Sequence, residues 1–154
     1  PTLLIDVLKA VVASLLGLWI IGHGAWGIVV GGYSCILGHT FPIFMDFKGG
    51  KGIATFAGVI LVLNPGLGVI LLIVGIIFNI LIKVYSIVSV LGVFVTAVLF
   101  SVLTKGSDLV PTLLFVWVMF LQTLITHKNN LKRIRNGQEN QLDIFSKKPR
   151  RNLK

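Results

Sequence analysis

The sequence has few charged residues, very few acidic ones, and a single cysteine. Charged residues make up 12% of the 154 positions, and only 5 of them are acidic. Because Cys35 is alone, the chain has no internal disulfide and no cysteine metal cluster, and we interpret it as a small packing residue. The nucleotide P-loop, His-Glu-x-x-His, Gly-x-Ser-x-Gly and acidic pairs placed for a metal are all missing. We therefore expect no cofactor and no metal.

Apolar residues are what the chain has in excess. They account for 55% of the sequence, and the mean hydropathy of +0.95 is not that of a soluble domain. Because a backbone in lipid must satisfy its own hydrogen bonds, each apolar run predicts a helix. We expect an all-α polytopic membrane protein with about six transmembrane helices, at residues 3–21, 25–37, 53–63, 67–82, 87–103 and 110–125. The second and third runs are shorter than the roughly 20 residues of a span, so we expect them to extend, tilt or thin the membrane.

The charge distribution predicts the topology and excludes one class of partner. The net charge is +9, but most basic residues lie in loops and in the tail, where anionic lipid explains them better than nucleic acid does. If all six runs cross, every basic residue except Lys105 shares one face, which the positive-inside rule makes cytoplasmic. Making the two short runs re-entrant would place Lys48 and Lys51 outside and is disfavoured. We expect one membrane domain at 1–145 and a basic, disordered tail at 146–154.

The segment from Gly38 to Gly52, GHTFPIFMDFKGGKG, joins two apolar runs. Glycines let a backbone approach a ligand and expose its N–H groups, lysines supply positive charge, and the helix that follows adds its N-terminal dipole. This combination indicates an anion site at the membrane surface, with Lys51 as the main candidate. Lys48 has the alternative role of only setting the orientation of the protein. His39 either binds a ligand or braces the loop.

Two ionisable residues lie within the first apolar run. Asp6 and Lys9 are spaced i, i+3, so they share a helix face and can pair. They form either an exposed surface pair or a functional pair at the edge of a span, where ionisable residues usually have a role. His23 falls on the opposite face of the membrane, and we expect it to be solvated.

Two further polar pairs fall on the predicted cytoplasmic face. Ser86 and Ser89 are one turn apart at the start of the fifth run, where serine often bonds only to neighbouring helices. His127 and Asn130 are also one turn apart, where the last run leaves the membrane, and can face a pocket side by side. The segment that carries them has the alternative of being no more than a basic, lipid-bound end.

These motifs together resemble the bacterial integral-membrane acyl-phosphate:glycerol-3-phosphate acyltransferases, almost from end to end. The matching residues are DVLK from Asp6 to Lys9, the lysine loop from Leu37 to Thr55, the basic and serine pattern at Lys83, Ser86 and Ser89, and His127, Asn130 and Arg133 with the later Gly137 and Glu139. The lysine loop is highly specific, whereas the serine pair is weak alone. Lys83 stands where relatives commonly carry arginine.

The resemblance implies transfer of a fatty acyl group from acyl phosphate to the first hydroxyl of glycerol 3-phosphate, which makes lysophosphatidic acid. It implies a bacterial inner-membrane location, a cytoplasmic active site, and these substrates and membrane lipid as partners, without nucleic acid or an obligate protein partner. The expected catalytic residues are His127, Asn130 and Lys51. The expected substrate-binding residues are Lys48, Gly49, Gly50, Gly52, His39, Ser86, Ser89 and Arg133. The general base stays open between His127 and a phosphate of the substrate.

Members of this family also have a first span and a Gly-Ser-Gly-Asn loop that helps to hold the substrate phosphate and would stand just before Pro1. We therefore expect seven helices in an intact member, and expect the chain as given to be incomplete as an enzyme. Two other classes stay open: a small-anion transporter or channel subunit, and a structural membrane protein with a basic tail. Polar residues at one face, not at the midplane, disfavour a transporter. A structural protein leaves the lysine loop unexplained.

Overall fold

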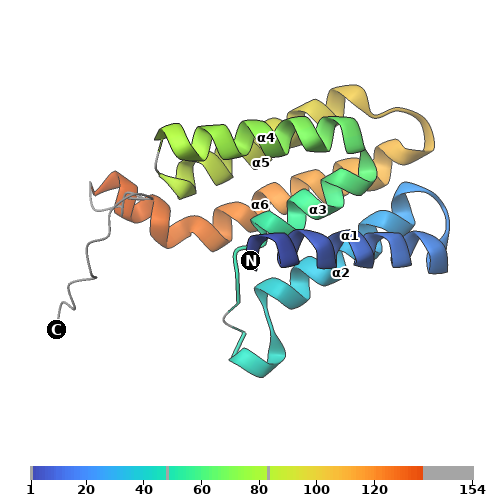
Figure 1. Cartoon of the computed structure of the whole chain (residues 1–154), viewed down its shortest axis with the longest axis horizontal. Coiled ribbons are helices and arrows are strands. Elements are labelled where there is room, and N and C mark those ends of the chain that lie inside the picture. Colours follow the sequence, from blue (N-terminus) through green and yellow to red (C-terminus); the bar gives the residue numbers. More distant parts are fainter. Residues whose placement is uncertain (1, 48, 83, 137–154) are drawn as a thin grey trace.

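The computed structural model describes residues 2–47, 49–82 and 84–136. Within these ranges the chain is helical and has no strand. Its elements are α1 (Thr2–Ile21), α2 (Ala25–Thr40), the 3-10 helix η1 (Ile43–Met45), α3 (Ile53–Leu63), α4 (Pro65–Ile82), α5 (Tyr85–Leu103), the 3-10 helix η2 (Gly106–Asp108) and α6 (Leu109–Arg135). Figure 1 shows α1 beside α2 and α4 beside α5, with α3 and α6 between these pairs. The expected all-α architecture is confirmed.

Among the α-helices in the described ranges, five are long and apolar enough to cross a membrane, and α3 is too short. The five spans are Thr2–Ile21, Ala25–Met45, Pro65–Ile82, Tyr85–Leu103 and Gly106–Arg135. The second apolar run extends, as expected, through the end of α2 into η1. The third stays at 11 residues. The protein is therefore a multi-pass membrane protein that also contains one short internal helix.

The short helix α3 lies in the interior of the bundle. It packs against α1, α2, α4 and α6, and its buried face includes Phe56 and Val59. Its 11 residues span about 16 Å, whereas the 18 residues of its antiparallel neighbour α4 span about 27 Å. Because the two helices meet at Asn64, α3 begins about 10 Å short of the level that α4 reaches. The glycine loop before α3 therefore enters the bundle instead of lying across its end.

Helices α1 and α2 approach closely along small residues. A Cβ atom on Gly17 would lie 2.9 Å from the Cα of Gly31. Lipid gives no hydrophobic drive for helices to associate, so contact between small residues is how membrane helices gain dispersion energy. Larger side chains fill the rest of the core, which contains Ile36, Phe56, Val59, Ile60, Val93, Phe100, Phe115, Val116 and Met119.

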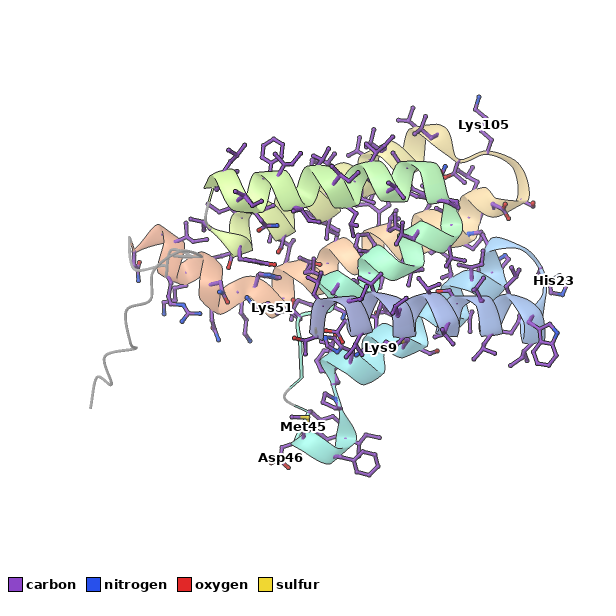
Figure 2. The ribbon with its side chains drawn as sticks, in the orientation of Figure 1. Lys9, His23, Met45, Asp46, Lys51 and Lys105 are labelled. Atoms are coloured by element: carbon purple, nitrogen blue, oxygen red, sulfur yellow. The ribbon has the colours of Figure 1, made fainter. Side chains whose placement is uncertain are left out.

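The two ends of the bundle differ in charge as the sequence predicted. Figure 2 shows Lys105 and His23 at one end, and Lys9 and Lys51 toward the other. Helix α6 continues beyond the expected end at residue 125 as far as Arg135. Its last turn carries Lys132, Arg133 and Arg135, whose positive charge suits the C-terminal end of a helix dipole. The segment after residue 125 therefore begins as helix. The expected boundary at 145 and the tail at 146–154 lie outside the described residues.

Candidate functional site

The glycine loop folds back onto the end of α2. After Thr40 the chain forms a hook that contains η1, and Figure 2 shows Met45 and Asp46 at its tip, away from the bundle. Two backbone hydrogen bonds close the hook: Gly49 N–H donates to Thr40 O at 3.2 Å, and Gly50 N–H donates to His39 O at 3.1 Å. These bonds bring the second half of the loop beside the last turn of α2.

Three of the predicted loop glycines sit where a side chain does not fit. A Cβ atom on Gly49 would lie 2.6 Å from Pro42 Cδ, and one on Gly50 would lie 2.7 Å from His39 Cε1. Gly52 has a φ of +84°, in the left-handed region that glycine adopts without strain, and Thr40 Oγ1 would be 3.1 Å from its Cβ. Packing alone therefore requires glycine at these three positions, whether or not the loop binds a ligand.

The start of α3 is held by the same loop. Gly52 O accepts the backbone N–H of Phe56 and the hydroxyl of Thr55, both at 2.8 Å. Lys51 precedes this point directly and is half-buried. Because α3 begins inside the bundle, the loop places Lys51 at the start of α3, where its side chain is partly covered by the protein. Lys48 lies outside the described residues.

Asp6, Lys9 and His39 form a polar cluster where α1 meets α2. Lys9 Nζ lies 2.6 Å from Asp6 Oδ1 and 2.9 Å from His39 Nδ1. Asp6 Oδ1 and His39 Nδ1 are 3.5 Å apart. The predicted pairing of Asp6 with Lys9 is confirmed, and the structure adds His39 as the third member. Its imidazole also lies against Gly50, so the cluster and the loop are in direct contact.

A second polar chain joins α2 to α6 through Gln122. The Gln122 side chain donates to Thr40 Oγ1 at 3.2 Å and accepts from Tyr33 OH at 3.0 Å. Both Gln122 and Thr40 are buried. Sequence reasoning missed these residues, although a glutamine in an apolar run is the kind of polar residue inside a span that marks a functional position.

His127 lies one to two turns beyond Gln122 on α6 and is 1% exposed. Its Nδ1 is 2.9 Å from Thr123 O. A carbonyl oxygen only accepts hydrogen bonds, so Nδ1 carries the ring hydrogen in this contact, and a neutral ring then has Nε2 as its acceptor. The backbone of α6 thus sets the tautomer of the predicted catalytic histidine.

The remaining predicted residues lie on α5 and α6 at the same end of the bundle. Ser86 and Ser89 are both buried at the start of α5, which packs against α6. Asn130 is half-buried one turn after His127, and Arg133 is exposed one turn further on. The structure therefore brings the loop glycines together with His39 of α2, and it places the serines and the α6 residues on two helices that pack against each other. The hydrogen bond between Thr40 and Gln122 connects α2 with α6.

Comparison with known proteins gives the family of the chain. The family model described as "Glycerol-3-phosphate acyltransferase" matches residues 1–137. The chain belongs to the glycerol-3-phosphate acyltransferase family. This finding confirms the family resemblance, and the match includes every predicted site residue from His39 to Arg133.

Curated members of this acyltransferase family match most of the chain. The glycerol-3-phosphate acyltransferase of Thermoanaerobacter sp. (strain X514) is 37% identical over 144 residues, which covers 92% of this chain and 69% of the relative. The Finegoldia magna protein of the same name is 36% identical over 141 residues, with 92% and 69% covered. The chain thus spans about 69% of the length of these relatives.

Solved structures of the acyltransferase family have the same fold. A crystal structure of PlsY (YgiH), an integral membrane glycerol 3-phosphate acyltransferase in its lysophosphatidic acid form, matches with a TM-score of 0.80 and 25% identity, covering 91% of this chain and 70% of that one. The glycerol 3-phosphate form matches with a TM-score of 0.82 and 24% identity, covering 94% and 72%. The helix arrangement of this family member is therefore that of an integral membrane acyltransferase.

Proposed function

We propose that this protein transfers a fatty acyl group from acyl phosphate to the sn-1 hydroxyl of glycerol 3-phosphate, giving lysophosphatidic acid and inorganic phosphate. The observation that carries the proposal is a glycine and lysine loop packed into one end of a membrane bundle of this family, beside the buried Gln122 of α6. Acylation of glycerol 3-phosphate follows from the family. The donor and the acylated position are the finer part of the proposal.

The chemistry suits a site of donors and cations without a strong nucleophile. The substrate hydroxyl oxygen attacks the acyl carbonyl carbon, an ester bond forms, and the bond between that carbon and the phosphate oxygen breaks. The hydroxyl proton ends on the released phosphate, either directly or by way of His127. Because acyl phosphate is already activated, alignment and charge stabilisation supply most of what the protein must add.

The site residues divide into two roles in this proposal. Lys51 offsets phosphate charge in a partly desolvated position, where such contacts are stronger than in water. His127 Nε2 accepts a hydrogen bond from the substrate hydroxyl. Asn130, on the same side of α6, orients the glycerol. The residues that hold the substrates are His39, Lys48, Gly49, Gly50, Gly52, Ser86, Ser89 and Arg133. The acyl tail of the donor stays in lipid, since nearly all of the helix surfaces around the bundle are apolar.

The charge bias supports a cytoplasmic site. Of the lysines labelled in Figure 2, Lys9 and Lys51 lie toward the end that carries the predicted site, whereas Lys105 lies at the other. By the positive-inside rule the site then faces the cytoplasm, in a bacterial inner membrane. Labelling of single-cysteine variants at positions 51 and 105 in intact cells tests this placement, which predicts that only position 105 reacts with an impermeant reagent.

The decisive experiment is an assay of the full-length protein that carries this sequence, purified in detergent with no other protein. Acyl phosphate and glycerol 3-phosphate are expected to give lysophosphatidic acid and one equivalent of phosphate, whereas acyl-CoA is expected to give neither. Lys51→Ala should raise the KM for glycerol 3-phosphate by about 10-fold or more, as expected for one lost contact to a charged group. Lys105→Ala, at the opposite end, is the matched control. Unchanged affinity in Lys51→Ala would remove the role assigned to this lysine.

The same preparation separates the proposal from a small-anion transporter or channel subunit. In sealed proteoliposomes without an acyl donor, a transporter would move glycerol 3-phosphate or phosphate across the bilayer, whereas the proposed enzyme would not. The position of Lys9 and Lys51 toward one end of the bundle in Figure 2 favours the enzyme, because transporters bind their substrates near the midplane.

A further inference from the structure

The cluster of Asp6, Lys9 and His39 joins three ionisable side chains from two helices, and the proposed chemistry uses only the histidine. Lys9 Nζ lies 2.6 Å from the Asp6 carboxylate and 2.9 Å from His39 Nδ1, and these two partners are 3.5 Å apart. The Asp6 and His39 side chains are 20% and 19% exposed. The Asp6 and His39 side chains are therefore mostly shielded from solvent, whereas that of Lys9 is 37% exposed, and hydrogen bonds in such a partly desolvated place are stronger than in water.

The donors and acceptors of this cluster determine where the His39 ring hydrogen lies. An ammonium group has three donors and no acceptor, so Lys9 bonded to Asp6 can only donate to His39. His39 Nδ1 must then be an acceptor without a hydrogen. A hydrogen on Nδ1 would place two donors 2.9 Å apart, which is unfavourable while Lys9 is charged. The contacts therefore favour a neutral His39 with its hydrogen on Nε2.

The ring nitrogen that carries this hydrogen faces the glycine loop. If Gly50 had a Cβ atom, Nε2 would be its nearest neighbour, and Cε1 and Cδ2 would follow at 2.7 Å and 3.0 Å. The Nε2 edge of the imidazole therefore fills the space that a side chain at position 50 would need. This position directly precedes Lys51. A hydrogen-bond donor at this place adds to the positive charge that Lys51 brings to the loop.

We propose that Asp6 and Lys9 are positioning residues that hold His39 as an Nε2–H donor toward the phosphate of the bound substrate at the glycine loop. The proposal rests on the proposed function for the identity of the ligand, but the tautomer of His39 does not depend on it. Lys9 supplies the donor that fixes Nδ1 as an acceptor. Asp6 holds Lys9 in place and balances its charge, so the cluster itself adds no net charge to the membrane edge.

Removal of Lys9 should reverse the tautomer. In Lys9→Met the Asp6 carboxylate, 3.5 Å from Nδ1 in the native protein, becomes the only charged neighbour in the cluster. Nδ1 then gains the hydrogen and donates to Asp6, and Nε2 becomes an acceptor that repels a phosphate oxygen. Lys9→Arg keeps a donor without an acceptor and should keep the native tautomer. Asp6→Asn should also keep it, because Lys9 stays.

Nitrogen-15 NMR of the histidine rings tests the tautomer directly in the full-length protein in detergent. His39 signals are assigned with a His39→Gln variant, since the chain has 3 histidines. The expected result is an unprotonated Nδ1 and a protonated Nε2 in the native protein, in Lys9→Arg and in Asp6→Asn, and the reverse in Lys9→Met. A native Nδ1 that carries the hydrogen, or a Lys9→Met spectrum like the native one, would overturn the proposal.

Kinetics test the consequence for the substrate. Lys9→Met should raise the KM for glycerol 3-phosphate by about 10-fold, the effect of losing one hydrogen bond to a charged group, with a much smaller change in kcat. Lys9→Arg should restore most of the affinity, and Lys105→Met, the same change at the opposite end, should have none of this effect. An unchanged KM in a Lys9→Met protein whose tautomer has reversed would refute the donor role of His39. Native tautomers as expected, in a protein without acyltransferase activity, would refute the proposed function and leave the positioning roles supported.

Discussion

Replacement of Gly50 by alanine is the sharpest test of how the glycine loop and His39 fit together. The new methyl group would take the space that the His39 ring occupies, 2.7 Å from Cε1 and 3.0 Å from Cδ2. The φ of Gly50 is not in the left-handed region, so the clash with the ring is the main cost and backbone strain adds little. Movement of the ring away from the methyl group would disturb its 2.9 Å contact with Lys9.

The expected magnitude follows from these two consequences. Overpacking by one methyl group costs about 1–3 kcal/mol, and a hydrogen bond to a charged group contributes about 1.5–3 kcal/mol. These two costs are alternatives and do not add. If the His39 ring is displaced, its clash with the new methyl group is relieved, but its hydrogen bond to a charged group is lost. We therefore expect Gly50→Ala to weaken binding of glycerol 3-phosphate by about 10-fold to 100-fold.

The assay compares the KM for glycerol 3-phosphate and the apparent melting temperature in detergent for Gly50→Ala and Gly38→Ala. Gly38 is a helical glycine next to His39 with nothing within 4 Å of its Cβ position, so alanine there should be neutral or slightly stabilising. A double variant, Gly50→Ala with His39→Ala, should be no less stable than His39→Ala alone, because the clash is gone. Equal KM values for Gly50→Ala and Gly38→Ala would show that the ring does not lie against the loop.

Three further predictions concern the rest of the bundle. Gln122→Leu removes the amide that donates to Thr40 Oγ1. The loss of about 1–2 kcal/mol of stability should lower the apparent melting temperature. An unchanged melting temperature would mean that the hydrogen bond between Gln122 and Thr40 is not formed. Gly31→Ala should be destabilising by about 1–3 kcal/mol, because the new Cβ meets the backbone of α1. Gly75→Ala is the matched control and should not be destabilising, because nothing lies within 4 Å of its Cβ position. Phe44 is 100% exposed, so the stability of Phe44→Ser to thermal unfolding should equal that of the native protein within about 0.5 kcal/mol. A larger loss of stability would place Phe44 in the packed structure.

The helices and the loop chemistry were predictable because their causes are local. The length of an apolar run and the hydrogen-bond demand of a backbone in lipid determine where α1, α4 and α5 lie, and their bounds agree with the expected runs within a few residues. The extension of α6 to Arg135 was less visible, since its last turns are polar. Apolar composition marks the part of a helix that meets lipid and not the part that projects beyond it.

The partners of the site residues were not predictable in the same way. His39 and Lys9 are 30 positions apart, and Gln122 and Thr40 are 82 apart, so their contacts depend on the rotation and depth of whole helices. The pairing of Asp6 with Lys9 was foreseen because i, i+3 spacing operates within one helix. His39 was expected at the site with its role undecided between ligand and brace, and the structure shows its ring against Gly50, a contact that the sequence did not reveal.

Hydropathy, turn residues and charge act over short stretches of chain, so they were enough to predict a helical membrane protein with a glycine and lysine loop at a basic end. The packing of the helices in three dimensions was needed to show that α3 is a short interior helix, that Gly52 and Lys51 enter the bundle, and that Lys9 and Gln122 support the loop from two sides. The physical reason is that close packing between helices sets depth and rotation together, and no single segment carries that information.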